Sequence, residues 1–164
     1  MIPGVVWGAA EAERELSLPC DELQPLGQQA DRAISIDAPL GVVFGWLCQL
    51  RVAPYSYDLI DNLGRRSPTR RDPELTELEA GQRFMFAFRL HSFVPDGHLT
   101  MTSGNLAVTY AIRSEEAGTR LHVRLRWRVP RIAFHALSFG DLLMMRKQLR
   151  TLKELAEAEA RSAR

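Results

Sequence analysis

Hydrophobic and polar residues alternate with a period of two in the stretch from Arg120 to Val129. The apolar positions are Leu121, Val123, Leu125, Trp127 and Val129, and the polar positions between them are Arg120, His122, Arg124, Arg126 and Arg128. This period is typical of a β-strand with one face in a core and the other in water. At ~3.3 Å per residue the strand spans ~33 Å, longer than most strands. It therefore predicts a large antiparallel sheet whose apolar face needs a cover.

Shorter patterns predict the other elements. Alternation indicates strands at 32–37, 75–78, 84–91, 98–103 and 106–112, with turns at 95–97, 104–105 and 116–118. Connections this short favour a meander of neighbouring strands. Helical spacing predicts two short helices, at 40–50 and 55–62, and a long one from Ala136 to Ala160. The long helix carries an apolar stripe made of Leu137, Leu142, Met145, Leu149, Leu152 and Ala156.

The order of these elements predicts an α+β fold. We expect a curved antiparallel sheet of six or seven strands wrapped around the long C-terminal helix, with two short helices after the first strand. A helix is only ~10–12 Å across, so it leaves a wedge beside a curved sheet of long strands. That wedge is either a cavity for an apolar ligand or a filled core, because protein interiors are close-packed. Residues 1–28 are expected to form an extended arm with at most one helical turn, and 29–160 a single domain.

Composition narrows the function classes. The chain has 164 residues, 46% of them hydrophobic, and a net charge of +1. Near neutrality argues against a nucleic-acid-binding protein. Cys20 and Cys48 are too few for a disulfide framework. No apolar run of ~20 residues predicts a membrane span, and no signal peptide is evident, so we expect a cytoplasmic protein.

Known catalytic and metal-binding motifs are absent from the sequence. It has no GxSxG, no glycine-rich phosphate loop and no HExxH. His91, His98, His122 and His135 are not spaced as metal ligands on one element, so no metal or cofactor is expected. We expect His122 to be solvated on the polar face of the long strand.

Several short segments resemble a known superfamily. They are Arg32–Pro39 with Trp46-Leu47, Trp7-Gly8-Ala9, Tyr55–Asp58 with Asp61-Asn62, and Met145–Glu154. Together they resemble the START-like superfamily, which includes polyketide cyclase/dehydrase-like and Bet v 1-like proteins, and within it a mostly uncharacterised bacterial subgroup. The sequence departs from this pattern in its arginine-rich stretch after Asn62 and in Cys20, where a glycine is expected. The resemblance implies the helix-grip fold and an apolar cavity for a lipid, polyketide, steroid or quinone-like molecule.

The inward pattern predicts which residues would line such a cavity. On the walls we expect Phe84, Phe86, Phe88, Met101, Tyr110, Trp127, Leu142, Met145 and Leu149, and at the mouth Tyr55 and Tyr57. A phenol in an apolar pocket orients a ligand carbonyl or hydroxyl. The alternative is that one of the two tyrosine rings is core and the other surface.

A second hypothesis is an enzyme of cyclase or aromatase type, with Tyr55, Tyr57 and Asp141 as the candidate catalytic residues. Burial beside a pocket would raise the pKa of Asp141 and suit it to acid–base work. Alternatively, Asp141 caps or is solvated in the first turn of the last helix.

A third hypothesis is an interaction module, acting as a monomer or homodimer through the arm or the basic strand face. The loop 65–71, with Arg65, Arg66, Arg70 and Arg71, and the ladder Arg120, Arg124, Arg126 and Arg128 would hold an anionic group, and the ladder could instead contact acidic lipid or nucleic acid. Alternatively, as is usual for charge runs, these arginines are solvated or are neutralised by Glu74, Glu77, Glu79, Glu115 and Glu116.

Overall fold

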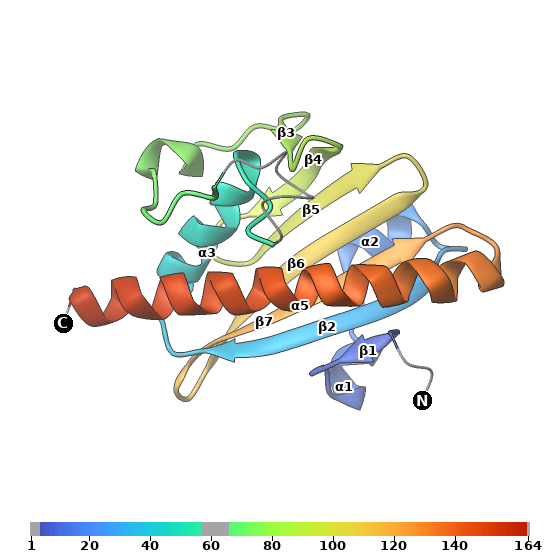
Figure 1. Ribbon diagram of the computed structural model, residues 1–164, viewed down its shortest axis with the longest axis horizontal. Helices are drawn as coiled ribbons and strands as arrows, with labels where there is room; N and C mark the ends of the chain where they lie inside the picture. Colours follow the sequence, from blue (N-terminus) through green and yellow to red (C-terminus); the bar gives the residue numbers. More distant parts are fainter. Residues whose placement is uncertain (1–3, 57–65, 164) are drawn as a thin grey trace.

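The computed structural model describes residues 4–56 and 66–163, and within them a single mixed sheet packed against one long helix (Figure 1). The seven strands lie in the order β1-β2-β7-β6-β5-β4-β3. Their bounds are β1 Val6–Trp7, β2 Gln28–Ile36, β3 Arg83–Phe84, β4 Phe88–Val94, β5 His98–Ser103, β6 Leu106–Glu115 and β7 Gly118–Trp127. All neighbours pair antiparallel except β1 and β2, which are parallel. The expected α+β fold is confirmed, with this parallel edge as a difference.

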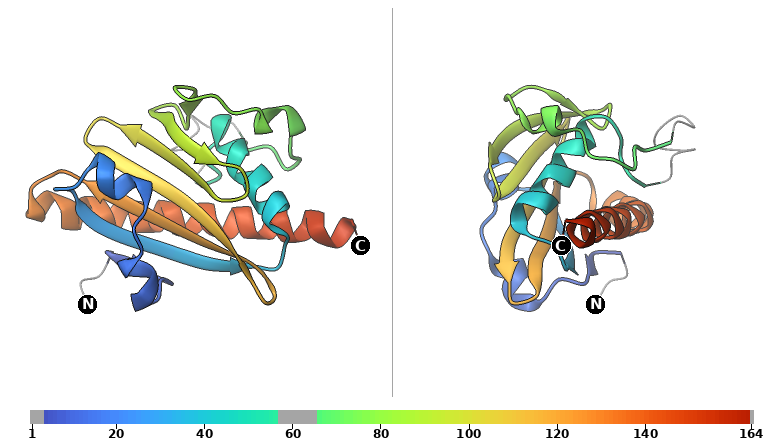
Figure 2. Two further views of the ribbon diagram at one scale, coloured as in Figure 1. Left: turned by 180° about the vertical axis from the view of Figure 1, so that it is seen from behind. Right: turned by 90° about the vertical axis from the view of Figure 1, so that its left-hand side faces the viewer.

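Helices cover both faces of the sheet. Helix α5 (Arg131–Ser162) and helix α3 (Leu40–Cys48), which continues into η1 (Gln49–Arg51), lie on one face, while α1 (Glu11–Glu15) and α2 (Pro19–Leu23) lie on the other (Figure 2). The main core is between the sheet and the α3 and α5 helices, where Leu121, Val123 and Leu149 are at most 1% exposed. No helix in the described part of the chain combines the length and apolarity needed to cross a membrane.

The long strand was predicted correctly, but the environment of its polar face was not. β7 pairs with β2 on one side and β6 on the other, and its apolar residues face α5. On the opposite face, His122 and Arg124 are 0% and 1% exposed, so the expectation that His122 is solvated is wrong. His122 and Arg124 are buried because the N-terminal segment covers this face of the sheet.

The N-terminal segment is more structured than the expected extended arm. β1 joins the sheet, and two one-turn helices follow instead of one. Each helix has an acidic residue that accepts a hydrogen bond from the backbone N–H three residues earlier: Glu13 from Ala10 at 2.7 Å, and Asp21 from Leu18 at 2.9 Å. A carboxylate that accepts from a backbone N–H in this way stabilises the first turn of a short helix.

Two expected strands differ in the structure. The stretch 84–91 is broken, because Met85 and Phe86 have φ values of +41° and +58° and separate β3 from β4. The edge strand expected at 75–78 is replaced by η2 (Pro73–Thr76), a 3₁₀ turn in which the Asp72 side chain accepts from the Glu74 N–H at 3.0 Å. The helix expected at 55–62 falls mostly on residues 57–65, outside the described residues.

The C-terminal helix starts at Arg131, five residues earlier than expected. Pro130 precedes it, which is a favourable position for a residue that lacks an N–H. Asp141 therefore lies in the third helical turn. The alternative that it caps or is solvated in the first turn is wrong.

Candidate functional site

A cavity of about 220 Å³ lies between the first half of α5 and the strands β4, β6 and β7. Its described lining is Pro54, Ser56, Met85, Phe86, Phe88, Leu106, Val108, Tyr110, Leu125, Asp141, Met144, Met145 and Gln148. Phe86 and Met144 are on its solvent side, with exposed fractions of 51% and 41%. The lining is mostly apolar, with a few polar groups among the side chains. This combination is typical of small-molecule sites.

One polar group of the cavity is a hydrogen-bonded tyrosine and glutamine pair. The Tyr110 hydroxyl, buried on β6, donates to Oε1 of Gln148 on α5 at 2.8 Å. The Gln148 amide in turn donates to the Pro54 carbonyl at 2.6 Å. Burial raises the pKa of Tyr110, so this phenol is a neutral hydrogen-bonding group. The pair joins the sheet, α5 and the segment before residue 57 at the cavity wall.

A second polar group is the carboxyl of Asp141. Arg32 on β2 contacts it, with 3.2 Å between Nη2 and Oδ2. The arginine is fully buried, and its guanidinium also donates to the Val5 and Gly4 carbonyls at 2.8 and 2.6 Å. Burial raises the pKa of Asp141 to about 6, and the nearby positive charge of Arg32 opposes this rise. A carboxyl with such a pKa can donate or accept a proton near neutral pH.

The predicted wall residues are divided between the cavity and the core. Those on the cavity wall are Phe86, Phe88, Tyr110 and Met145. Asp141, predicted as a candidate acid–base group, is also on this wall. Their role as ligand contacts stays a prediction, because placement alone does not show binding.

Other predicted residues lie elsewhere. Phe84, Met101 and Leu149 are fully buried in the core beside the cavity, and Trp127 and Leu142 are partly buried and outside its lining. Phe84 is separated from Phe86 and Phe88 because the expected strand breaks at residue 85.

The two predicted tyrosines are not both placed. Tyr55 is 1% exposed and packs edge-on against Trp46, with 6.0 Å between ring centroids, and it is not on the cavity wall. Tyr57 lies outside the described residues.

Sequence reasoning missed Arg32 and Gln148. Arg32, Ile34 and Ile36 are alternate residues of one strand, so their side chains point to the same, apolar face of the sheet. A charge on that face needs a buried partner. Gln148 is three residues after Met145, inside the apolar stripe of the last helix. A polar residue at a core position was the available signal in both cases.

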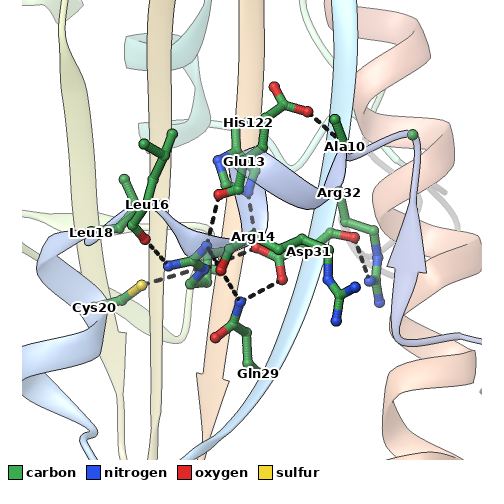
Figure 3. Close-up of polar contacts among 12 residues, drawn as sticks. Ala10, Glu13, Arg14, Leu16, Leu18, Cys20, Gln29, Asp31, Arg32 and His122 are labelled. Carbon is green, nitrogen blue, oxygen red and sulfur yellow. Dashed lines mark hydrogen bonds and ion pairs between the residues drawn. The ribbon is translucent and has the colours of Figure 1, made fainter.

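A second polar cluster is buried under the N-terminal segment, on the opposite face of the sheet (Figure 3). Asp31 Oδ1 on β2 accepts from Arg124 Nε and lies near His122 Nε2, each at 2.9 Å. Arg124 also donates to the carbonyls of Arg14 and Glu13, at 2.8 and 3.0 Å. The network therefore holds α1 on the sheet, and its residues are buried away from the cavity.

Most arginines of the basic strand ladder therefore form ion pairs or hydrogen bonds to backbone carbonyls. Arg120 bonds Glu13 at 2.7 Å, and Arg113 contacts the same carboxylate. Arg126 donates to the carbonyls of Gln24 and Pro25. The expectation of a free or solvated basic face is wrong for Arg120, Arg124 and Arg126, and only Arg128 of the ladder is exposed.

The arginine-rich loop is also partly neutralised. Arg71 forms a bidentate pair with Glu159 of α5, and its closest N–O distance is 2.6 Å. Arg66 and Arg70 are exposed, and Arg65 is outside the described residues. A wide hollow beside this pair is larger than the cavity, about 470 Å³, but it is more open and less enclosed by apolar side chains. We regard the smaller, more enclosed cavity as the better ligand site.

Comparisons with known proteins support the fold. No family model and no curated protein sequence matches the chain. Similar solved structures include a structural-genomics protein from Rhodobacter sphaeroides, with 14% identity, a TM-score of 0.56 and coverage of 79% of this chain and 93% of that one. A protein from Mesorhizobium loti has 15% identity, a TM-score of 0.54 and coverage of 80% and 98%.

A third similar structure is that of DynU16, a putative protein in the dynemicin biosynthetic locus. It has 16% identity and a TM-score of 0.51, and the match covers 76% of this chain and 46% of that chain. At identities this low, the structural similarity shows a shared fold and nothing more. Function must therefore be argued from the site itself.

Proposed function

We propose that this protein binds a hydrophobic small molecule, such as a lipid, polyketide, steroid or quinone, for transport, sequestration or presentation. The observation that carries the proposal is the cavity of about 220 Å³ beside α5, which is lined mainly by apolar side chains and has Tyr110, Gln148 and Asp141 at its wall. The apolar lining would supply affinity, and the polar groups would orient a ligand oxygen. The fold shared with a protein from a biosynthetic locus is consistent with this function.

The size of the cavity favours a compact ligand. Its volume of about 220 Å³ exceeds the ~150 Å³ of an apolar cavity that binds benzene and is below the ~300 Å³ typical of larger ligand sites. A molecule of one or two rings with a carbonyl or hydroxyl group therefore fits best. A longer ligand must extend outward past Phe86 and Met144.

A matched pair of variants tests the proposal. Met144 and Leu143 are neighbours on α5 with similar exposed fractions, 41% and 49%, but only Met144 lines the cavity. We expect 1,4-naphthoquinone and 1-naphthol to bind the wild-type protein and Leu143→Trp, and Met144→Trp to lower the affinity by at least about tenfold by blocking the entrance. Calorimetry in vesicle-free solution measures this. Equal affinities in the two variants, or no binding of either probe to the wild-type protein, contradict the proposal.

The alternative is a cyclase or aromatase-like enzyme, and the placement of Asp141 favours it as the second candidate. Its carboxyl, with a pKa raised to about 6, is at the wall of an apolar cavity that could hold a substrate in a fixed conformation. Turnover of a linear polyketide mimic by the wild-type protein and loss of turnover in Asp141→Asn would support an enzyme. Binding without turnover would instead support the proposed binding function.

A further inference from the structure

The first half of α5 presents a row of large apolar side chains to solvent. Ile132, Phe139 and Leu143 are 88%, 53% and 49% exposed and follow one another at i, i+7 and i+11, which places them on one stripe. Ala136 and Gly140, also exposed, lie between them and add no polar group. This stripe lies on the opposite side of α5 from its buried residues Phe134, Ser138 and Met145. A contiguous apolar surface of this kind indicates an interaction site.

The apolar row continues to the entrance of the cavity. Leu137 and Met144 are each 41% exposed and lie on the adjoining stripe of the helix. Met144 and Phe86 both line the cavity, and both are exposed. Whatever covers the row therefore also meets the entrance.

Basic residues flank both ends of this row. Arg128 and Arg131 are exposed at its N-terminal end, and Arg146, Lys147 and Arg150 are exposed at its C-terminal end. Between residues 128 and 153 the sequence has one acidic residue, Asp141, which is paired with the buried Arg32. The rim is therefore strongly positive. An apolar helix face with a basic rim is typical of helices that lie in the interface of an anionic bilayer.

We infer that the first half of α5, together with Phe86, docks on an anionic lipid bilayer and places the cavity entrance at the membrane surface. Apolar side chains would enter the boundary between headgroups and acyl chains, while the rim arginines and Lys147 would contact phosphate groups. A second copy of this chain fits less well, because a symmetric contact would bring two basic rims together. The inference concerns the surface and holds whichever ligand occupies the cavity.

Vesicle flotation tests the inference with the full chain. We expect the wild-type protein to float with vesicles of phosphatidylcholine and phosphatidylglycerol, to bind pure phosphatidylcholine vesicles much less, and to be released by salt. The variant Ile132→Ser/Phe139→Ser/Leu143→Ser should lower the partition coefficient by at least about tenfold. The control Leu26→Ser/Val94→Ser, at residues 83% and 51% exposed but outside this face, should float like the wild-type protein.

A charge variant keeps the test independent of folding defects. Arg131→Glu/Lys147→Glu leaves every apolar residue in place and should also abolish flotation on anionic vesicles. The inference is overturned if the wild-type protein fails to float at low salt, or if the triple serine variant or the charge variant floats like wild type. It is also overturned if the wild-type protein is a dimer that the serine substitutions convert to a monomer. Naphthoquinone binding in vesicle-free solution should survive the serine substitutions, which separates this inference from the proposed function.

Discussion

Arg32 and Asp141 form an ion pair that joins β2 to α5 beside the cavity, with 3.2 Å between Nη2 and Oδ2. Arg32 is fully buried, whereas the Asp141 side chain is 19% exposed. The pair therefore places a carboxyl with a raised pKa on the cavity wall. It also anchors to the sheet the first half of α5, which covers the cavity.

The pKa of Asp141 gives a specific pH dependence. The value is raised to about 6 in the native protein from 3.8, so between pH 4 and 6 the native state binds more protons than the unfolded state. The free energy of unfolding should therefore fall as pH rises through this range, by up to ~3 kcal/mol, and level off above it. Asp141→Asn should remove this fall. Urea denaturation at pH 4 and 7 measures it, with the exposed Glu74→Gln as control, and parallel curves for wild type and Asp141→Asn would be the contrary result.

Glu13 should show the opposite dependence. Its hydrogen bond with Arg120 is the main cause that lowers the pKa to about 2, from 4.5. The stabilisation is present above pH 4.5 and is lost as pH falls toward 2, because the unfolded state binds the proton first. We expect a loss of ~3 kcal/mol over this range in the wild-type protein and a much flatter acid limb in Glu13→Gln. Acid unfolding followed by circular dichroism decides this, and the same acid limb in both proteins would refute it.

The hydrogen bond from Tyr110 to Gln148 predicts an energetic coupling. Tyr110→Phe removes the hydroxyl that donates to the buried Gln148 Oε1 at 2.8 Å. Because this acceptor is then unpaired, the free energy of unfolding should fall by ~1–2 kcal/mol. In a double-mutant cycle with Gln148→Leu, the two losses should add to more than the loss in the double variant, because the second substitution removes an acceptor that is already unpaired. Strictly additive losses would show that the two residues are independent.

The cluster under the N-terminal segment predicts a large cost for one substitution. Asp31→Asn removes the carboxylate that pairs with the buried Arg124 at 2.9 Å. Loss of one partner of a buried pair costs ~3–5 kcal/mol because the remaining charge stays buried. We expect the lower end of this range, because Asp21 still pairs with Arg124 at 2.8 Å. The matched control is Glu159→Gln, which breaks a pair with 25% and 31% exposed partners and should cost ~1 kcal/mol or less. Similar losses in chemical denaturation would contradict the assigned role of Asp31.

Regular patterns predicted most of the sheet, and local exceptions were hidden from sequence. β5 was predicted over 98–103, which are its bounds in the structure, because alternation and turn residues agreed there. The strand over 84–91 was not, because alternating phenylalanines gave no sign of the positive φ at Met85 and Phe86. Backbone breaks of this kind depend on tertiary packing.

Part of the cavity wall was predicted from the sequence, and its role as a ligand site stays a prediction. Tyr110 and Met145 were found because each follows a single apolar stripe. The buried state of His122 was missed, because the alternation of β7 does not reveal that α1 and α2 cover its polar face. Contacts between segments far apart in the chain leave no periodic pattern in the sequence. Arg32 and Gln148, by contrast, were detectable as polar residues at apolar positions.

Methionine methyl resonances give the most direct test of the central claim, that the space beside α5 admits an apolar guest. Met85, Met144 and Met145 line the cavity, while Met101 is fully buried outside it. In an NMR titration of methyl-labelled protein with 1,4-naphthoquinone, we expect saturable shifts of the first three signals and little change at Met101. Unchanged signals at Met85, Met144 and Met145 at saturating probe concentration would contradict the account.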